Sequence, residues 1–298
     1  MKRISKEHVT CTLSKQHPPV ERIASGETVV FETLDCYGNQ LRDEAFTFSD
    51  IRRDFNNPAT GPLYVEGAMP GDMLKIEIVD IRVGDQGVMA VRPGAGALGD
   101  IFRSARTKII PVENGQVLFN ERINIPLNPM IGVIGVAPLQ EMKTTVPHLH
   151  GGNMDCKRII KGSTLYLPVL VEGALLSIGD LHGVMGDGEV VICAVEMEGE
   201  VTVKVEVVKG RNLPLPFVVE GDTVMVIASE QTLDEAARAA TKAMHGFLSQ
   251  EIGMDTHEAG MLLSLIGELK ICQIVDPLMT TRMELPLSVL ECYGYRLP

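Results

Sequence analysis

Two short stretches near the middle of the chain gather side chains that bind metal ions. They read HLHGGNMDC, from residue 148, and GDLHGVMGDGE, from residue 179, and they hold three of the seven histidines. Imidazole nitrogens and carboxylate oxygens are the usual protein ligands of zinc, and two histidines with one or two carboxylates recur at catalytic zinc sites. The candidate side chains are His150, Asp155, His182, Asp187 and Glu189.

Glycines around these side chains favour one site over two unrelated surface turns. Two glycines follow His150 directly, and Gly188 separates Asp187 from Glu189. Glycine permits tight bends and lets the backbone approach a ligand closely. His148 lies two residues before His150 and would share its side of a strand, so whether His148 is a further ligand stays open.

An alternative reading makes the acids a calcium site in a non-catalytic β module. The oxygen ligands would then come from glycine turns that contain Asp72, Asp180, Asp187 and Glu189. Calcium takes oxygen ligands and does not select imidazole, so a site that includes histidine indicates a transition metal instead. A zinc site and an additional calcium site could also coexist.

Composition restricts the possible partners. The chain has 298 residues with 45% hydrophobic content, which suffices for one large domain or two small ones. A net charge of -12 argues against a surface that binds nucleic acid, because such surfaces need a positive field. No stretch has the length of an apolar membrane span or of a signal-peptide core, so we expect no membrane association.

The cysteines indicate a reducing compartment. All six are widely scattered and none forms a CxxC pair. A chain of this length does not need disulfides in place of a core. We expect reduced, mostly buried thiols and a cytoplasmic protein.

Most of the chain reads as short strands rich in Val, Ile and Thr and separated by Gly, Asp or Pro. The pattern changes at Thr232, which with Glu235 has the spacing of a capping box before an alanine-rich run. Asp255, followed by Glu258, should cap a second, buried helix. The sequence therefore predicts a β-rich α+β fold with a helical pair inserted near residues 232–270.

A weak internal repeat suggests two related β units. VEGA occurs at residues 65–68 and again at 171–174, and GD follows in both copies. Each copy reads as a strand, a tight turn and another strand. We expect two packed units, barrel-like or sandwich-like, over residues 1–140 and 141–298, with the metal site and the helical pair in the second.

The motifs now quoted resemble those of the acetamidase/formamidase family. The resemblance rests on GPLYVEGAMPGDMLKIEIVDI and on HGGNMDCKRIIKGSTLYLPVLVEGALLSIGDLHGVMGDGEV, and it extends more loosely to QIVDP and LPLSVL. It implies an enzyme that hydrolyses short aliphatic amides to a carboxylic acid and ammonia. It also places the family's histidines and acids at the five candidate positions named above.

Amide hydrolysis assigns roles to these residues. An amide needs a strong nucleophile, stabilisation of an oxyanion and a proton for the leaving nitrogen. We expect a divalent metal, preferably zinc, on His150, Asp155 and His182, because zinc lowers the pKa of water to about 7. Glu189 would be the base, with Asp187 as a ligand or an orienting group. The amide of Asn153 and the N–H groups of the two glycines after His150 would contact the oxyanion.

A thiol mechanism is the competing hypothesis for the same reaction. Cys156 lies beside Lys157, and a glutamate such as Glu66 or Glu172 could act as its base. The metal mechanism is favoured, because both glutamates occupy equivalent places in the VEGA repeat, which suits a structural role.

The sequence also predicts the substrate pocket and the assembly. Few aromatic side chains and no Trp favour a small pocket lined by aliphatic residues and Met, which would accept an amide of about one to three carbons. The family resemblance and the exposed edges of a strand-rich protein favour a homo-oligomer, either a dimer or a tetramer.

Overall fold

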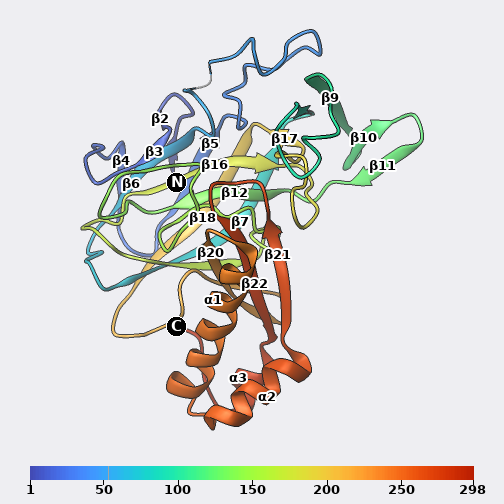
Figure 1. Ribbon diagram of the computed structural model, residues 1–298. Helices are drawn as coiled ribbons and strands as arrows, with labels where there is room; N and C mark the ends of the chain where they lie inside the picture. Colours follow the sequence, from blue (N-terminus) through green and yellow to red (C-terminus); the bar gives the residue numbers. More distant parts are fainter. Residues whose placement is uncertain (53) are drawn as a thin grey trace.

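Two large β-sheets face each other across the main hydrophobic core. The computed structural model describes residues 1–52 and 54–298, and Figure 1 shows the sheets above a cluster of helices. The core between the sheets takes Ile76 and Val203 from one sheet and Ile134, Leu176 and Ile178 from the other. The β-rich α+β prediction is confirmed.

The first sheet has nine strands. In spatial order they are β1 (Lys2–Ile4), β5 (Thr28–Thr33), β18 (Gly199–Val208), β7 (Met73–Val83), β15 (Thr164–Pro168), β19 (Phe217–Glu220), β20 (Thr223–Glu230), β22 (Met279–Pro286) and β21 (Glu268–Gln273). Strand β21 is therefore an edge strand. Only β1 and β5 run parallel in this sheet, and the other neighbours are antiparallel.

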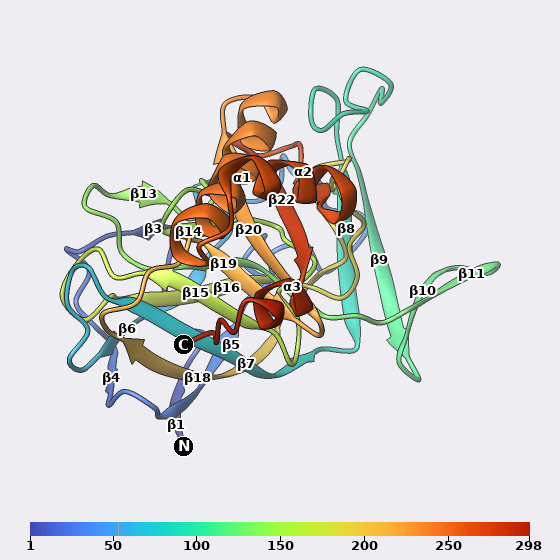
Figure 2. The ribbon, with the colours of Figure 1, turned by 90° about the horizontal axis from the view of Figure 1, so that it is seen from below.

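The second sheet has eleven strands. Its main path is β11 (Ile123–Pro126), β10 (Gln116–Asn120), β9 (Arg106–Glu113), β8 (Gln86–Val91), β17 (Glu196–Met197), β16 (Leu176–His182), β12 (Met130–Gly135) and β14 (Gly151–Asn153). Strand β6 (Ala59–Val65) pairs with β16 and carries β2 (Val9–Thr10) and β4 (Glu21–Ile23). A separate two-stranded sheet joins β3 (Thr12–Leu13) to β13 (Met142–Lys143). In Figure 2 the β10–β11 hairpin extends away from the body.

The two halves of the chain are interleaved. Both large sheets draw strands from residues 1–140 and from residues 141–298. The two VEGA turns meet directly, because the Val65 N–H donates to the Gly173 carbonyl at 3.0 Å and the Gly173 N–H donates to the Ala68 carbonyl at 2.9 Å. The repeat thus marks two turns that pair with each other inside one body.

The helical insertion follows its predicted caps. Helix α1 (Leu233–Gly246) begins at Thr232 with a complete capping box to Glu235, and the helical turn η1 (Phe247–Glu251) continues it. Asp255 caps helix α2 (Thr256–Ile266) by accepting two backbone hydrogen bonds. A short helix α3 (Ser288–Cys292) follows β22. None of the described helices is long and apolar enough to cross a membrane.

Helix α2 differs from the buried helix that its composition predicts. It ends at Ile266, because Gly267 leaves the helical conformation and β21 begins at Glu268. Met261 is 66% exposed and Leu265 is 79% exposed, so only part of the helix faces the core of α1 and β22. An apolar helix face is left without a partner.

Candidate metal centre

The site is built on strand β16 and its neighbours. Asp180 and His182 lie two residues apart on β16 and share one face of the sheet. Glu196 is the residue opposite His182 on β17. Asp155 follows β14, and Glu189 lies in the loop between β16 and β17. Residues far apart in the chain therefore meet through strand pairing.

Four carboxylates surround one ring nitrogen. The distances from Nε2 of His182 are 3.3 Å to Glu196 Oε2, 3.4 Å to Asp180 Oδ1, 3.8 Å to Asp155 Oδ1 and 4.0 Å to Glu189 Oε1. Two ligands of one tetrahedral zinc ion, each bound at about 2.0–2.1 Å, lie about 3.3–3.4 Å apart. The shorter spacings therefore suit ligands that share one small cation.

Several buried polar atoms of the site lack a hydrogen-bond partner in the part of the chain that the structure describes. Among the described residues, buried side-chain atoms without a hydrogen-bond partner include both oxygens of Asp155, Asp180 Oδ1, Glu196 Oε2 and both ring nitrogens of His182. These side chains are at most 2% exposed. Leaving a buried polar group unpaired costs about 1–3 kcal/mol, and more for a charged one. A bound cation would satisfy these atoms together.

The backbone is strained at three of these residues. Asp155, Asp180 and Glu189 all have positive φ angles, between 44° and 56°. Such left-handed conformations are uncommon outside glycine and cluster at functional sites, where the surrounding structure enforces them. All three residues with this conformation place a carboxylate oxygen within 4.0 Å of His182 Nε2.

Gly132 on β12 leaves room for two of the carboxylates. A Cβ atom at this position would lie 2.5 Å from Asp155 Oδ1 and 2.7 Å from Asp180 Oδ2. Either contact is far inside the van der Waals distance, so a side chain at residue 132 would have to displace one of the two acids.

The site contains acids and amides that the motif analysis did not assign. Glu196 and Asp276 complete the cluster, and Asn57 donates from Nδ2 to Asp180 Oδ2 at 2.9 Å. Asn153 donates from Nδ2 to Asp276 Oδ2 at 2.8 Å, while its Oδ1 has no partner. The predicted oxyanion contact from the Asn153 amide would therefore compete with Asp276.

A pocket of about 360 Å³ opens onto the cluster. Its walls come from Cys36, Tyr37, Phe48, Asn56 and Asn57, from Arg92 and Thr145, and from the segments that carry Asn153, Glu189 and Asp276. Tyr37 and Phe48 line it, and no methionine is among the described lining residues. Ile192 and Val275 supply the predicted aliphatic part of the lining, but the predicted methionines are not among the described residues there, and the segment after β5 brings two aromatic rings instead.

Only part of the HLHGGNMDC motif lies at the carboxylate cluster around His182. His150 is buried and both of its ring nitrogens lack partners, yet it is not part of the ligand-atom group of Asp155, His182 and Glu189. His148 is exposed. The backbone N–H of Gly151 donates to the His148 carbonyl at 2.9 Å, so it is not free for an oxyanion.

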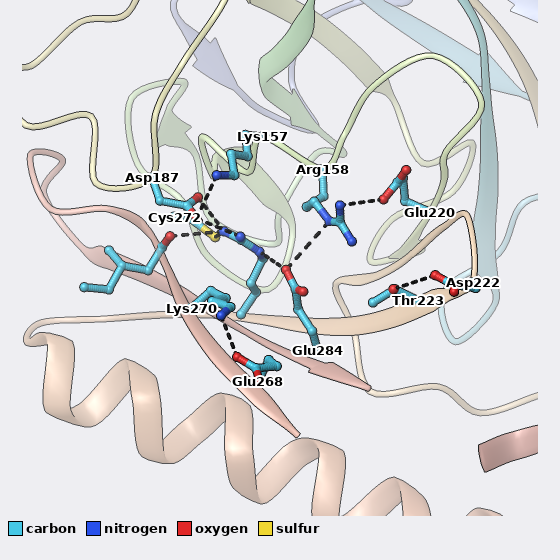
Figure 3. Close-up of polar contacts among 12 residues, drawn as sticks. Lys157, Arg158, Asp187, Glu220, Asp222, Thr223, Glu268, Lys270, Cys272 and Glu284 are labelled. Atoms are coloured by element: carbon cyan, nitrogen blue, oxygen red, sulfur yellow. Dashed lines mark hydrogen bonds and ion pairs between the residues drawn. The ribbon is translucent and has the colours of Figure 1, made fainter. Parts of the chain in front are cut away.

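Asp187 points to a different partner. Its two oxygens accept hydrogen bonds from the buried Arg282 guanidinium at 2.8 and 2.9 Å, and Lys157 Nζ lies 3.0 Å away (Figure 3). Burial alone would raise the pKa of Asp187, but Arg282 and Lys157 hold that pKa below its ordinary value. The structure places Asp187 as an anchor of the loop and not among the clustered carboxylates.

The loop that carries Glu189 is also tied to strand β21. The Gly188 N–H donates to the Cys272 carbonyl at 2.8 Å, and the Ile274 N–H donates to the Gly188 carbonyl at 3.1 Å. Cys272 lies next to the Arg282 contact in Figure 3. Two backbone hydrogen bonds thus join the residue before Glu189 to the edge of the first sheet.

Cys156 is fully buried and is not among the residues that line the pocket. A hydrogen bond with Cys272 lowers the pKa of the Cys156 thiol, against the effect of burial. The Cys156 thiol therefore lies near Cys272 and Arg282. The preceding residue, Asp155, lies on the other side, with Oδ1 at 3.8 Å from His182 Nε2.

Burial raises the pKa of four carboxyl groups at the site, those of Asp155, Glu189, Glu196 and Asp276. The pKa of Asp155 rises to about 7 through burial and then through Asp180, and burial also raises the pKa of Glu196 to about 7. The pKa values of Glu189 and Asp276 lie well above their ordinary range, because both are desolvated and both face Asp155. Several of these groups hold protons near neutral pH when no cation is present.

The two buried histidines shift in opposite directions. Burial disfavours the imidazolium of His182, but Glu196 and Asp180 outweigh it and raise the His182 pKa well above 6.5. Burial, with a smaller effect of His148, lowers the pKa of His150 to about 4. His150 is therefore neutral, whereas His182 is charged in the metal-free cluster.

The stability of the metal-free protein should depend on pH. Asp155 and Glu196 keep protons up to about pH 7 that the unfolded chain releases near pH 4, so the folded state binds more protons and raising the pH destabilises it. The raised pKa of His182 acts in the same direction above pH 6.5, while the lowered pKa of His150 opposes it below that pH. Between about pH 5 and about pH 8, we expect a widening Tm gap between zinc-loaded and chelator-treated protein.

Scanning calorimetry of both forms checks this expectation. Surface groups that titrate in the same way in both forms do not affect the difference in Tm between the two forms. A chain of this size shifts its Tm by about 2 °C for each kcal/mol. A gap that stays constant over this pH range would contradict the assignment of these carboxyl groups to a cation site.

A comparison with known protein families finds one match. The model of the Acetamidase/Formamidase family matches residues 4–148 and 140–292, which is nearly the whole chain. A curated formamidase of Methylophilus methylotrophus is 28% identical over 264 residues, 66% of this chain and 64% of that protein. This chain therefore spans slightly less than two thirds of the length of that relative.

Solved structures match over almost their full length. The crystal structure of an acetamidase from Bacillus halodurans has a TM-score of 0.97 and 49% identity, covering 98% of this chain and 100% of that one. A predicted acetamidase/formamidase from Thermoanaerobacter tengcongensis also has a TM-score of 0.97, with 41% identity over 99% of each chain.

Proposed function

The chain belongs to the acetamidase/formamidase family, and we propose that it is a metal-dependent hydrolase of short aliphatic amides, which it converts to a carboxylic acid and ammonia. The observation that carries the metal requirement is the convergence of unpartnered buried oxygens and nitrogens on His182. Hydrogen bonds within the protein do not account for these atoms, whereas a divalent cation would.

The proposed ligands are Asp155 and His182, with the facing carboxylates of Asp180 and Glu196 completing the set. We propose zinc, because imidazole nitrogen with carboxylate oxygen is a usual zinc donor set. When bound, the cation would polarise the amide carbonyl and lower the pKa of water beside it. His150 stays a candidate ligand only if its ring turns toward the cluster.

A second group of ligand atoms is formed by Cys36, Asp180 and Glu196. The two groups adjoin, because His182 lies between their carboxylates. Calcium would use the carboxylates but not the thiol of Cys36. An additional calcium ion therefore receives less support from this donor set than a second zinc-like ion does.

Glu189 is the proposed base. It lines the pocket and is 8% exposed, more than Asp155, Asp180 or Glu196, so water and substrate can reach its carboxylate. Its raised pKa suits a group that takes a proton from water and returns it to the leaving nitrogen near neutral pH. Asn153, beside Asp276 on the same wall, would orient the amide.

Two measurements on the same protein, its metal content and its release of ammonia from amides, test the proposed function. We expect purified protein to contain a divalent metal and to release ammonia from formamide and acetamide. Chelation should abolish both properties, and added zinc should restore them. Ammonia release that survives complete removal of metal would contradict the metal mechanism, and metal-loaded protein that cleaves neither amide would contradict the function.

The same assay addresses the two alternatives. A thiol amidase that uses Cys156 would be inactivated by iodoacetamide and not by a chelator, but the thiol is buried away from the pocket. A non-catalytic binding module would hold the metal and release no ammonia. The six cysteines are all free, which fits the cytoplasmic location that we propose.

We also propose that the chain self-associates through α2 and β21. An apolar patch there consists of exposed side chains from both elements, namely Met261, Leu265, Ile266, Leu269 and Ile271. Strand β21 is an edge strand, and Glu268 and Lys270 flank Leu269 on it. An antiparallel pairing of two copies about Leu269 would place each Glu268 opposite the partner's Lys270.

Charge on the patch should dissociate the oligomer. Glutamate in place of both Leu265 and Leu269 would bury like charges against each other in the paired copies. In light scattering we expect the wild type at a multiple of 32.4 kDa and the double variant at 32.4 kDa. Met69→Glu, at an exposed methionine outside the patch, is the control. A wild-type protein that is monomeric at micromolar concentration would refute the proposal.

A further inference from the structure

One cation in the pocket has no part in the proposed chemistry. Arg92 follows strand β8 and lines the same pocket as Asp180, Glu189 and Glu196. Among the described lining residues it is the only one with a positive charge. Its place beside several carboxylates would ordinarily lead to an ion pair.

Arg92 is nevertheless unpaired within the part of the chain that the structure describes. It takes part in none of the ion pairs within 4.0 Å, although other arginines do. Its Nε atom is buried and has no hydrogen-bond partner. A guanidinium offers five N–H donors in a fork that matches a carboxylate, so an unused one facing a pocket is suited to an anionic ligand.

Aromatic rings hold the guanidinium in place. The Arg92 Cζ atom lies 5.0 Å from the centre of the Phe48 ring, and Phe48 packs edge-on against Tyr37 at 5.6 Å. Tyr37 is buried and fixes this stack against the floor of the pocket. A cation–π contact positions an arginine without neutralising it, so its charge stays available to a ligand.

The pocket therefore has two chemically different regions. The carboxylates and His182 form one, where a cation and the amide would bind. Arg92, on its aromatic support, forms the other. A simple amide such as acetamide uses only the first region, and it leaves the guanidinium partly desolvated and unpaired, which is unfavourable.

We propose that Arg92 binds a carboxylate at the far end of the substrate. The preferred substrates are then half-amides of short dicarboxylic acids, such as malonamate and succinamate. This inference rests on the proposed amide hydrolysis. The C–N bond of the half-amide breaks, the hydroxyl of water forms the new C–O bond, and the nitrogen leaves with the other proton of water as ammonia. The new carboxylic acid then gives its proton to ammonia, so the products are a dicarboxylate and ammonium.

Matched substrates test the preference. Succinamate and butyramide have carbon chains of the same length and differ at the end opposite the amide. In the metal-loaded wild type we expect kcat/KM for succinamate to exceed that for butyramide by about 10- to 100-fold, since charge-assisted hydrogen bonds are involved. Arg92→Gln should remove this ratio while changing kcat/KM for butyramide by less than about threefold.

Two further variants sharpen the test. Arg92→Lys keeps the charge but loses the fork, so it should retain part of the preference. Arg92→Glu should favour 4-aminobutyramide, whose far end is cationic. Arg238→Gln, at an exposed arginine on α1, is the matched control and should keep the wild-type ratio.

Binding of succinate gives a readout that does not depend on turnover. By calorimetry we expect wild-type protein and Arg238→Gln to bind succinate more tightly than butyrate, and Arg92→Gln to bind both equally. Loss of this difference in Arg92→Gln supports the inference even if the wild type cleaves no amide, in which case the proposed function alone fails. Cleavage of acetamide with unchanged selectivity and succinate binding in Arg92→Gln would overturn the inference and leave the function standing.

Discussion

Replacing His182 with alanine is expected to empty the metal centre and to lower kcat/KM for acetamide by roughly a thousandfold or more. The ring nitrogen of His182 is the shared neighbour of four carboxylates. Without it, those acids would repel one another and the cation would lose its nitrogen ligand. Metal analysis of the purified variant and ammonia release measure the two effects separately.

His148→Ala is the matched control for this loss. His148 belongs to the neighbouring motif but is exposed, so its removal should leave metal content and turnover close to those of the wild type. A histidine that merely packs in the core costs about 0.5–3 kcal/mol of stability and spares the activity of the folded fraction. A folded His182→Ala protein that keeps its metal and near-normal turnover would remove the cluster from consideration as the active site.

Glu189→Gln should separate chemistry from metal binding. The amide keeps the size of the side chain but cannot take a proton from water, so we expect turnover to fall by about 10²- to 10⁴-fold. Asp155, His182 and the two remaining acids on β16 and β17 should retain the cation. Initial rates with acetamide and the zinc content of the same sample give the comparison.

Glu198→Gln controls for the loss of a glutamate in the same region. Glu198 lies two residues after Glu196, but it forms surface ion pairs with Lys6 and Arg42 and is not part of the metal cluster. Its variant should keep wild-type turnover. If Glu189→Gln instead loses its metal, Glu189 is a ligand and the proton acceptor must be sought among the other acids that line the pocket.

His182 and Glu189 could be predicted as candidates because they share a short stretch with glycines that permit unusual backbone conformations, whereas Asp180 was assigned only to the alternative calcium site. Asp180, His182 and Glu189 lie within ten residues, and their convergence follows from strand alternation and one loop. Glu196 and Asp276 were not predictable in this way. Glu196 reaches the site through its pairing with His182, and Asp276 arrives from the turn between β21 and β22.

The misplaced expectations have a common physical cause. Asp187 lies close to His182 in the sequence and is followed by a glycine, a pattern that indicated a metal ligand. In the structure both of its carboxylate oxygens accept hydrogen bonds from the buried Arg282. Helix α2 has the composition of a core helix, yet its neighbours cover only one face and leave Leu265 in solvent. Arg282 lies 95 residues from Asp187 in the sequence, and the covered face of α2 depends on how α1 and β22 are placed in space. The local sequence pattern specifies neither.

The two hydrogen bonds between Gly188 and residues 272 and 274 make the edge of the sheet and the loop that carries Glu189 one mechanical unit. Coupling between two binding events is reciprocal. A ligand that orders this loop therefore strengthens binding at the ordered edge by the same factor by which binding at the edge strengthens the hold on the ligand. A substrate held against Glu189 would then tighten the association of two copies at β21, and association would tighten the hold on the substrate. Dilution alone would in that case weaken substrate binding, so that specific activity depends on protein concentration.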